Sequence, residues 1–202
     1  MSEAVLATPV RLPAGAHGHR GVGWWGLLCA IAAEAALFAY LLFAYYYSAI
    51  ESGRDFIPGP LPELRLALPN TLVLLLSSAS VWCAERSVHK ARNGRALCWL
   101  IATLALGALF VSVQLLEWKS KPFSISSGSY GSLYFTITGF HMAHVVAGLV
   151  ALVLAAIWCA RGYFSVWRDV PIAIVATYWH FVDAVWLCVF FTIYVSPRLW
   201  AP

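Results

Sequence analysis

The sequence predicts an all-α polytopic membrane protein in which five transmembrane helices form a bundle. Of its 202 residues, 61% are hydrophobic and 11% are charged, whereas a soluble domain is roughly 45–50% apolar and about 25% charged. Five long apolar stretches follow one another, and a bilayer span needs about 20 such residues. Backbone polar groups in hydrocarbon must be bonded within their own segment, so these spans are helices. We expect residues 1–22 to form a cytoplasmic N-terminal tail and residues 23–202 to form one five-helix transmembrane domain.

Aromatic residues and prolines mark the ends of the predicted spans. Trp24 and Trp25 open the first span, as expected for side chains at the level of the lipid headgroups. The proline-rich residues 51–68 cannot be helical throughout, and Pro69 is a favourable first-turn residue for the second span. The five predicted helices cover approximately residues 24–50, 69–84, 96–116, 130–160 and 171–196.

Lysine and arginine residues are divided unequally between the two sides of the predicted bundle. Eight lie in the N-terminal tail and in the loops that follow the second and fourth helices, against five on the opposite side. Because positive residues favour the cytoplasmic side, we expect a cytoplasmic N-terminus. These residues form no stripe suited to nucleic acid, and we expect no nucleic-acid partner. The eight are Arg11, Arg20, Arg86, Lys90, Arg92, Arg95, Arg161 and Arg168.

The sequence lacks the motifs of several functional classes. The N-terminal residues have no short apolar core before a cleavage site, so they do not predict a signal peptide. There is no Walker loop, no GxGxxG before a helix and no GxSxG. The five cysteines lie in or at the edges of apolar helices without a CxxC pair, which indicates small buried hydrophobic side chains. They are Cys29, Cys83, Cys98, Cys159 and Cys188.

Ionisable residues inside the last two apolar stretches are the main candidates for function. His141 and His144 share one face of the fourth predicted helix, and His180 and Asp183 share one face of the fifth. An ionisable group in hydrocarbon costs roughly 2.5–3.5 kcal/mol, so it needs a partner or a purpose. With a rise of about 1.5 Å per residue, His144 and His180 fall at similar depths. We therefore expect His141 or His144 to meet His180 or Asp183.

Two interpretations of these residues remain open at this stage. Facing histidines are what a b-type haem needs, and histidines with an aspartate could hold a metal ion. However, Trp179 and Phe181 crowd His180, and a single haem would leave one histidine unexplained. The residues favour interhelical hydrogen bonds within the bundle.

Two glutamates complete the set of candidate polar residues. Glu34 lies deep in the first span among alanines, and it is either a proton-relay residue or a carboxyl group that fixes helix packing. Glu117 lies at the end of the third span beside Lys119 and Lys121, which predicts an ion-pair cluster at the membrane interface. The candidate structural or proton-related network is Glu34, Glu117, His141, His144, His180 and Asp183.

From residue 25 to residue 196 the chain resembles subunit III of the haem-copper terminal oxidases, the cytochrome c oxidase family. The segments 130–145 and 178–186 look like the family's central and last helices, and Leu68–Thr71 looks like its Leu-Asn-Thr helix start. Glu34 falls where the family carries a glutamate inside the membrane. The chain is similar to the short, five-helix bacterial form, and a glutamate often found early in the last helix is here Ala173 or a neighbour.

The resemblance implies a non-catalytic subunit that supports proton uptake and stable turnover. Haems and copper are expected in the partner subunits I and II, with no cofactor-binding, metal-binding or catalytic residue in this chain. Phospholipid is expected to bind, and the bacterial inner membrane is the expected location. We also expect the first three helices to pack against subunit I through small residues. These are Ala32, Ala33, Ala35, Ala36, Ser77, Ser78 and Ser80.

Three alternatives differ in partner or in class. The chain could serve a quinol oxidase, since the electron donor is chosen by subunit II, or it could be the subunit-III-like protein of nitric oxide reductase. A free-standing transporter or proton channel using Glu34, His180 and Asp183 is a third alternative. Transporters usually show internal repeats and broken helices, and the sequence has neither.

Overall fold

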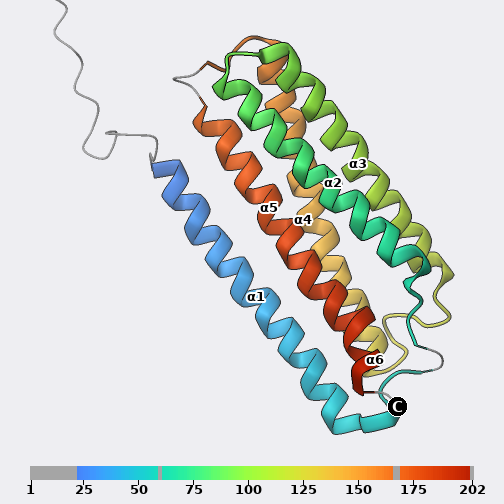
Figure 1. The fold of residues 1–202 in the computed structure, drawn as a ribbon. Coiled ribbons are helices and arrows are strands. Elements are labelled where there is room, and N and C mark those ends of the chain that lie inside the picture. Colours follow the sequence, from blue (N-terminus) through green and yellow to red (C-terminus); the bar gives the residue numbers. More distant parts are fainter. Residues whose placement is uncertain (1–21, 59–60, 166–168, 201–202) are drawn as a thin grey trace, which may run out of the picture.

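Five long helices run side by side and are long and apolar enough to cross a membrane (Figure 1). The computed structural model describes residues 22–58, 61–165 and 169–200. The predicted N-terminal tail lies outside these residues, apart from Val22. The helices are α1 (Val22–Ser52), α2 (Leu64–His89), α3 (Asn93–Ser120), α4 (Ser129–Ala160) and α5 (Val170–Phe190). The described part of the chain has no strand, so the predicted all-α membrane bundle is confirmed.

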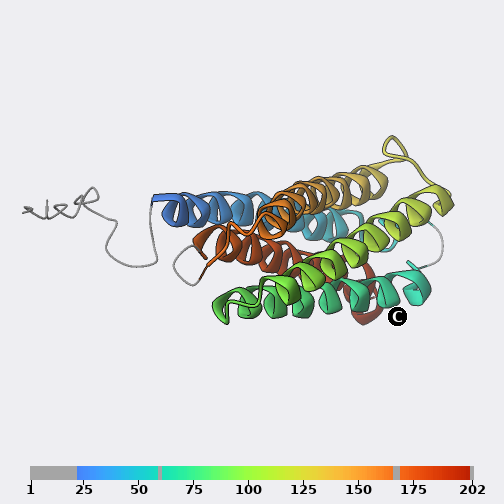
Figure 2. The same ribbon diagram turned by 90° about the horizontal axis from the view of Figure 1, so that it is seen from above.

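The helices α2 to α5 form the packed part of the bundle, and α1 lies along its edge (Figures 1 and 2). α2 pairs with α3 and also packs on α5, while α4 packs on α3 and α5. α1 packs mainly on α4 and α5. Only 6% of the most apolar window of α1 is buried, against 44% for the last span. α1 therefore leaves most of its surface open to lipid or to another protein.

The second helix begins earlier than the sequence predicts. α2 starts at Leu64, which places Pro69 inside the helix and not in its first turn. A proline there has no N–H to donate to the Arg65 carbonyl oxygen four residues earlier. The loss falls near the helix start, where carbonyl groups can reach interfacial water. The prediction that α2 begins at Pro69 is therefore wrong by about one and a half turns.

The last span is continuous but changes its winding near its end. α5 passes into a π-helical turn at Phe191–Val195 and then into α6 (Ser196–Trp200). Pro197 lies within α6, although the sequence predicts that the helix ends before it. The ring of a proline crowds the carbonyl group four residues earlier, here that of Ile193. A wider turn at this place relieves that crowding.

The centre of the bundle is built around Trp179 of α5. Its side chain is fully buried, and its Nε1–H donates to Ser77 Oγ of α2 at 3.0 Å. The ring lies against two glycines, Gly107 of α3 and Gly148 of α4. A Cβ atom would come within 2.9 Å of the indole at Gly107 and within 2.8 Å at Gly148. The two glycines thus let three helices close around one indole ring.

Candidate functional site

Glu34 and His144 form a polar contact between α1 and α4. Glu34 Oε2 lies 3.1 Å from His144 Nε2. The histidine side chain is 15% exposed and the glutamate side chain 41% exposed. The ring of Phe38 stands edge-on to the His144 ring at 5.2 Å. A carboxyl group inside the first span is therefore held against the bundle by one histidine and open on its other side.

The second ring nitrogen of His144, Nδ1, limits which protonation states this contact can have. His144 Nδ1 lies 2.7 Å from the Phe140 carbonyl oxygen, which can only accept a hydrogen bond. Nδ1 therefore carries a hydrogen, and a hydrogen bond between Nε2 and Glu34 Oε2 requires one further proton. Either the carboxyl group donates to a neutral imidazole, or the imidazolium donates to a carboxylate. The pair can hold one exchangeable proton without another ionisable partner.

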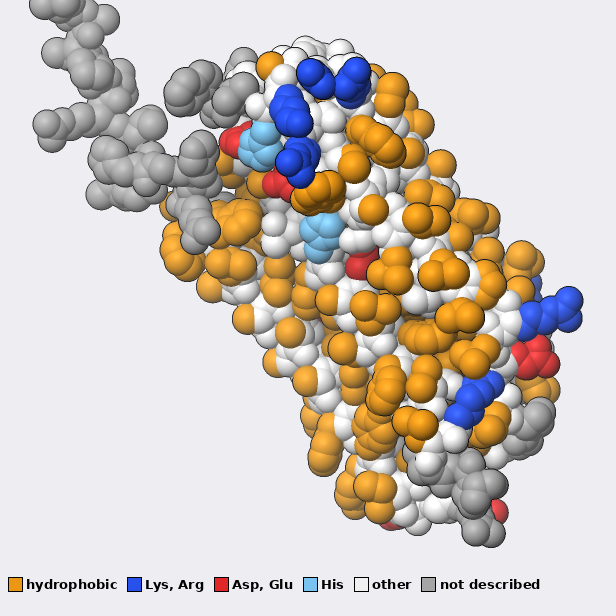
Figure 3. Space-filling model, in the orientation of Figure 1, with side chains coloured by type: hydrophobic (Ala, Val, Ile, Leu, Met, Phe, Trp, Pro, Cys, Tyr) orange, Lys and Arg blue, Asp and Glu red, His pale blue; other side chains and the backbone are white. Residues whose placement is uncertain are grey.

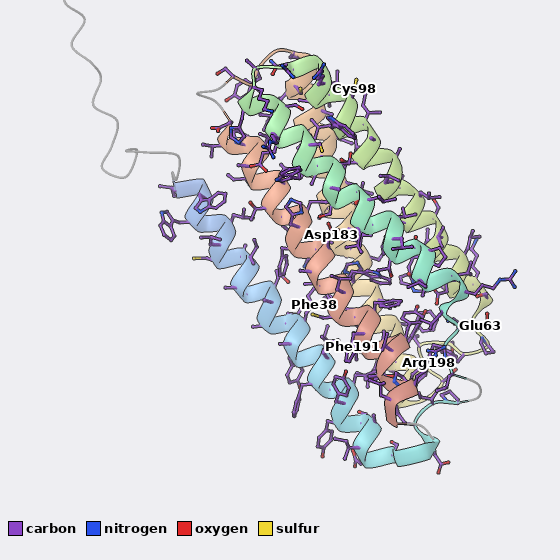
Figure 4. All side chains as sticks on the ribbon, in the orientation of Figure 1. Phe38, Glu63, Cys98, Asp183, Phe191 and Arg198 are labelled. Atoms are coloured by element: carbon purple, nitrogen blue, oxygen red, sulfur yellow. The ribbon has the colours of Figure 1, made fainter. Side chains whose placement is uncertain are left out.

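His180 contacts α2 and not the histidines of α4. His180 Nδ1 lies 2.6 Å from Ser78 Oγ. Asp183 follows one turn later, near the middle of α5 (Figure 4), and it is 4% exposed. Among the described residues, Asp183 makes no hydrogen bond to a histidine of α4, and the hydroxyl that interacts with its carboxyl group is that of Ser78. The expected hydrogen bond between the histidines of α4 and His180 or Asp183 is not formed, and this prediction is wrong.

His141 lies in an aromatic pocket in the middle of the bundle. It is fully buried, and neither ring nitrogen has a hydrogen-bond partner in the described part of the chain. Its ring centroid lies 4.9 Å from that of Trp186 and 6.0 Å from that of Phe110. His141 lies three residues before His144 on the same helix. It packs on Phe110 of α3, Trp186 of α5 and the edge of Phe38 of α1, whereas His144 bonds Glu34 of α1.

A second polar cluster lies around Glu117, where the end of α3, the start of α4 and the turn after α5 meet. This side chain is 3% exposed. Its Oε1 accepts hydrogen bonds from Tyr194 at 2.6 Å and from Tyr134 at 3.4 Å. Lys121 Nζ lies 2.9 Å from the same oxygen and over both tyrosine rings, at 5.3 Å and 5.9 Å from their centroids. We call Glu117, Lys121, Tyr134 and Tyr194 the Glu117 cluster.

The Glu117 cluster differs from the expected interfacial ion pair in two ways. Glu117 is buried and Lys121 is largely covered, and only Lys121 pairs with Glu117 while Lys119 is exposed. Neither tyrosine is among the residues predicted from the sequence. The signal that could have found them is their position in apolar helices, where a hydroxyl needs a partner. Gln114, one turn before Glu117, is also buried, and its amide atoms have no partner among the described residues.

The six candidate residues therefore do not form one network. The structure brings Glu34 to His144, His180 to Ser78, and Glu117 to two tyrosines and a lysine. The described residues contain no group of three or more His, Cys, Asp or Glu side chains placed to hold a metal ion. Serine and threonine hydroxyls of α2 accept the two indole N–H groups of α5, through Trp179 to Ser77 and Trp186 to Thr71.

The Glu34 contact predicts how firmly α1 is held. In Glu34→Ala the hydrogen bond to His144 is lost, and such interhelical bonds contribute about 0.6 kcal/mol on average. We expect faster hydrogen exchange in α1 peptides of the protein in nanodiscs, with α2 and α3 unchanged. The Glu34→Gln variant is the control, because its amide N–H can still donate to His144 Nε2. Equal loosening of α1 in both variants would contradict a role for this hydrogen bond.

Comparison with known proteins identifies the family. Residues 14–198 match the family described as Cytochrome c oxidase subunit III. A protein named Cytochrome c oxidase subunit 3 from Locusta migratoria is 34% identical over 177 residues, which cover 84% of this chain and 67% of the relative. Proteins of the same name from Lumbricus terrestris and Dasypus novemcinctus are each 36% identical, with 84% of this chain and 68% of the relative covered. The chain is thus a multi-pass membrane protein that belongs to the cytochrome c oxidase subunit III family.

Proposed function

We propose that the chain is the non-catalytic third subunit of an aerobic respiratory haem-copper oxidase of the cytochrome c oxidase type. The observation that carries the proposal is the family match over residues 14–198, which spans all five membrane helices. In this role the haems and copper belong to subunits I and II, which reduce oxygen and pump protons. The chain packs beside subunit I, binds phospholipid, and supports proton uptake and stability.

The proposed location is the inner membrane of a bacterium, with the N-terminus in the cytoplasm. Four of the basic residues lie in or next to the turn between α2 and α3, and this end of the bundle is also the end where α1 begins (Figure 1). Positive loops favour the cytoplasmic side. This orientation puts the Glu117 cluster near the outer surface and the α2–α3 turn at the inner surface.

The open side of α1 is the proposed surface for close approach to a partner. Ala32, Ala33, Ala35 and Ala36 are all exposed, and small side chains let helix backbones come close in a membrane. The serines of α2 serve a different purpose. Ser77 and Ser80 are buried, where they bond Trp179 of α5 and the Trp99 carbonyl of α3. The expectation that these serines face a partner subunit is wrong.

Purification through a tag on this chain tests the proposed function. We expect subunits I and II to be recovered with it, together with their haem absorbance and oxygen-reducing activity with reduced cytochrome c. A matched preparation from cells that carry the untagged chain controls for non-specific capture. Recovery of the chain without a haem-bearing partner would overturn the proposal. Activity with a quinol in place of cytochrome c would overturn the assigned donor.

The proposed supporting role also predicts the effect of Glu34→Gln on the oxidase. Glutamine keeps the shape of the side chain and a donor toward His144, so the initial rate of oxygen reduction should stay close to that of the wild type. The proton shared by Glu34 and His144 is lost, so activity should decline sooner over many turnovers. The measurement is oxygen consumption and proton pumping in liposomes. Immediate loss of both in an intact complex would show that Glu34 is an obligatory proton relay.

A further inference from the structure

The turn between α2 and α3 surrounds a small hollow with positive charge. Arg86, Lys90, Arg92 and Arg95 line a hollow of about 180 Å³ together with Trp99. All four basic side chains are exposed, and Lys and Arg side chains gather at this end of the molecule in Figure 3. None of the four makes an ion pair with any residue that the structure describes. We call this surface the basic turn.

The backbone of the basic turn holds these side chains close together. The Ala91 N–H donates to the Val88 carbonyl and the Arg92 N–H donates to the Ser87 carbonyl. These two hydrogen bonds form a tight turn directly after the last residue of α2. Ala91 has a φ of 53°, a left-handed conformation that glycine usually supplies at this position of a helix end. α3 then begins at once, at Asn93. The two helix ends therefore bring their basic residues to one place.

Among the described residues, no carboxylate balances the charge of the basic turn. Arg92 occupies the N-cap position of α3 without a capping hydrogen bond, and the first turn of α3 has no acidic residue. The positive end of the α3 dipole adds to the four side-chain charges. The neighbouring carboxylates Glu85 and Asp169 lie beside His89 instead, at 4.0 Å and 3.1 Å. An anion in the hollow would relieve this repulsion.

An apolar hollow adjoins the charged one and indicates what kind of anion fits. This region is a shallow, open depression on one face of α3, which shares Arg95 and Trp99 with the first hollow and is completed by Gly94 and Cys98. Figure 4 places Cys98 near the start of α3. Trp99 is 43% exposed, a position typical of tryptophan at headgroup depth. A phosphate group beside an apolar helix face at this depth is the arrangement that a phospholipid presents.

We propose that the basic turn binds the headgroup of an anionic phospholipid, with one acyl chain along Gly94, Cys98 and Trp99. The phosphate accepts hydrogen bonds from Arg92 and Arg95, since guanidinium groups bind phosphate in bidentate fashion. Arg86 lies over the Trp82 ring at 4.9 Å, which holds its charge at the membrane surface. The inference rests on the proposed function in that the inner leaflet, rich in anionic lipid, faces this turn.

Native mass spectrometry of the full chain tests the site, with dioleoyl phosphatidylglycerol and dioleoyl phosphatidylcholine as the titrated lipids. We expect tighter binding of phosphatidylglycerol by the wild type. In R92Q/R95Q its affinity should fall about tenfold or more, since each basic residue at the surface adds to the attraction. R86Q/K90Q should act similarly. The matched control is R65Q/K119Q, which removes two exposed positive charges at the opposite end and should leave the affinity unchanged.

Each contrary outcome overturns the proposal in a distinct way. Equal affinity for the two lipids, or an equal loss in R65Q/K119Q, would show that charge at this turn does not select the lipid. Displacement of phosphatidylglycerol by millimolar inorganic phosphate would show a site for a free anion. If R92Q/R95Q no longer co-purifies with the haem-bearing subunits but binds phosphatidylglycerol as the wild type does, the basic turn contacts a protein and not a lipid. A chain that binds phosphatidylglycerol here but recovers no haem-bearing subunit would overturn the proposed function and leave the lipid site standing.

Discussion

Gly148→Ala should destabilise the bundle, whereas the same change nine residues earlier, Gly139→Ala, should not. A Cβ atom at Gly148 would lie 2.8 Å from Cε3 and 2.9 Å from Cζ3 of Trp179, while at Gly139 no atom lies within 4 Å. Overpacking of this kind costs about 1–3 kcal/mol. In Gly139→Ala the removal of a helical glycine contributes about 0.5–1 kcal/mol of stability instead.

The indole of Trp179 has no direction in which to move away from the added methyl group. Gly107 of α3 lies against the ring on another side, where a Cβ atom would be 2.9 Å from Cη2. The Nε1–H is tied to Ser77 Oγ at 3.0 Å. Any shift of the ring therefore breaks that hydrogen bond or pushes α3 away.

Thermal unfolding in detergent, followed by circular dichroism, measures this effect. We expect a lower midpoint for Gly148→Ala than for the wild type, and an equal or higher midpoint for Gly139→Ala. Adding Trp179→Phe should recover part of the loss caused by Gly148→Ala, because a smaller ring leaves room for the methyl group. Full additivity of the two changes would show that they do not meet, and would contradict the packing described here.

The sequence predicts the spans well because each depends only on its own apolar residues. The five predicted helices and the five observed ones correspond one to one. The error at Pro69 has a local cause, since a proline near a helix start is compatible with the first turn and with the second. The sequence likewise predicts that Pro197 lies outside a helix, but the π-helical turn before it accommodates the proline and the helix continues.

The contacts of the polar residues depend on the rotation of each helix about its axis, which spacing alone does not give. His144 and His180 lie inside the fourth and fifth spans, but His144 turns to α1 and His180 turns to α2. Residues three apart on one helix can also diverge. His141 packs on Trp186 while His144 bonds Glu34. The role of α1 as a polar partner of α4 follows only from the assembled bundle.

The Glu117 cluster should respond most strongly when only one of its two charges is removed. In Glu117→Ala, Lys121 loses its counter-ion while its side chain is 12% exposed, and Tyr134 and Tyr194 lose their common acceptor. Breaking a buried ion pair on one side costs about 3–5 kcal/mol. The partial exposure of Lys121 lets its ammonium group move toward water, so we expect a cost of about 3 kcal/mol, at the low end of that range.

Removing both charges should cost less than removing Glu117 alone. In Glu117→Gln/Lys121→Met, the glutamine amide oxygen can still accept from Tyr194, and no unpaired charge is left near the rings. Lys119→Met is the matched control, because Lys119 is exposed two residues away and takes no part in the cluster. It should leave the unfolding midpoint unchanged. Thermal unfolding in detergent of the wild type, Glu117→Gln, Lys121→Met and the double variant gives the coupling between Glu117 and Lys121.

The physical reason for the expected coupling is the number of helices that meet at Glu117. One carboxylate oxygen joins the end of α3 to α4 through Tyr134 and to the π-helical turn after α5 through Tyr194. In a membrane these hydroxyls have few other acceptors. Glu117→Ala should therefore raise hydrogen exchange at the ends of all three helices together. If exchange rises in α3 alone, the cluster does not hold the three ends, and Lys121 is a surface charge that Glu117 happens to neighbour.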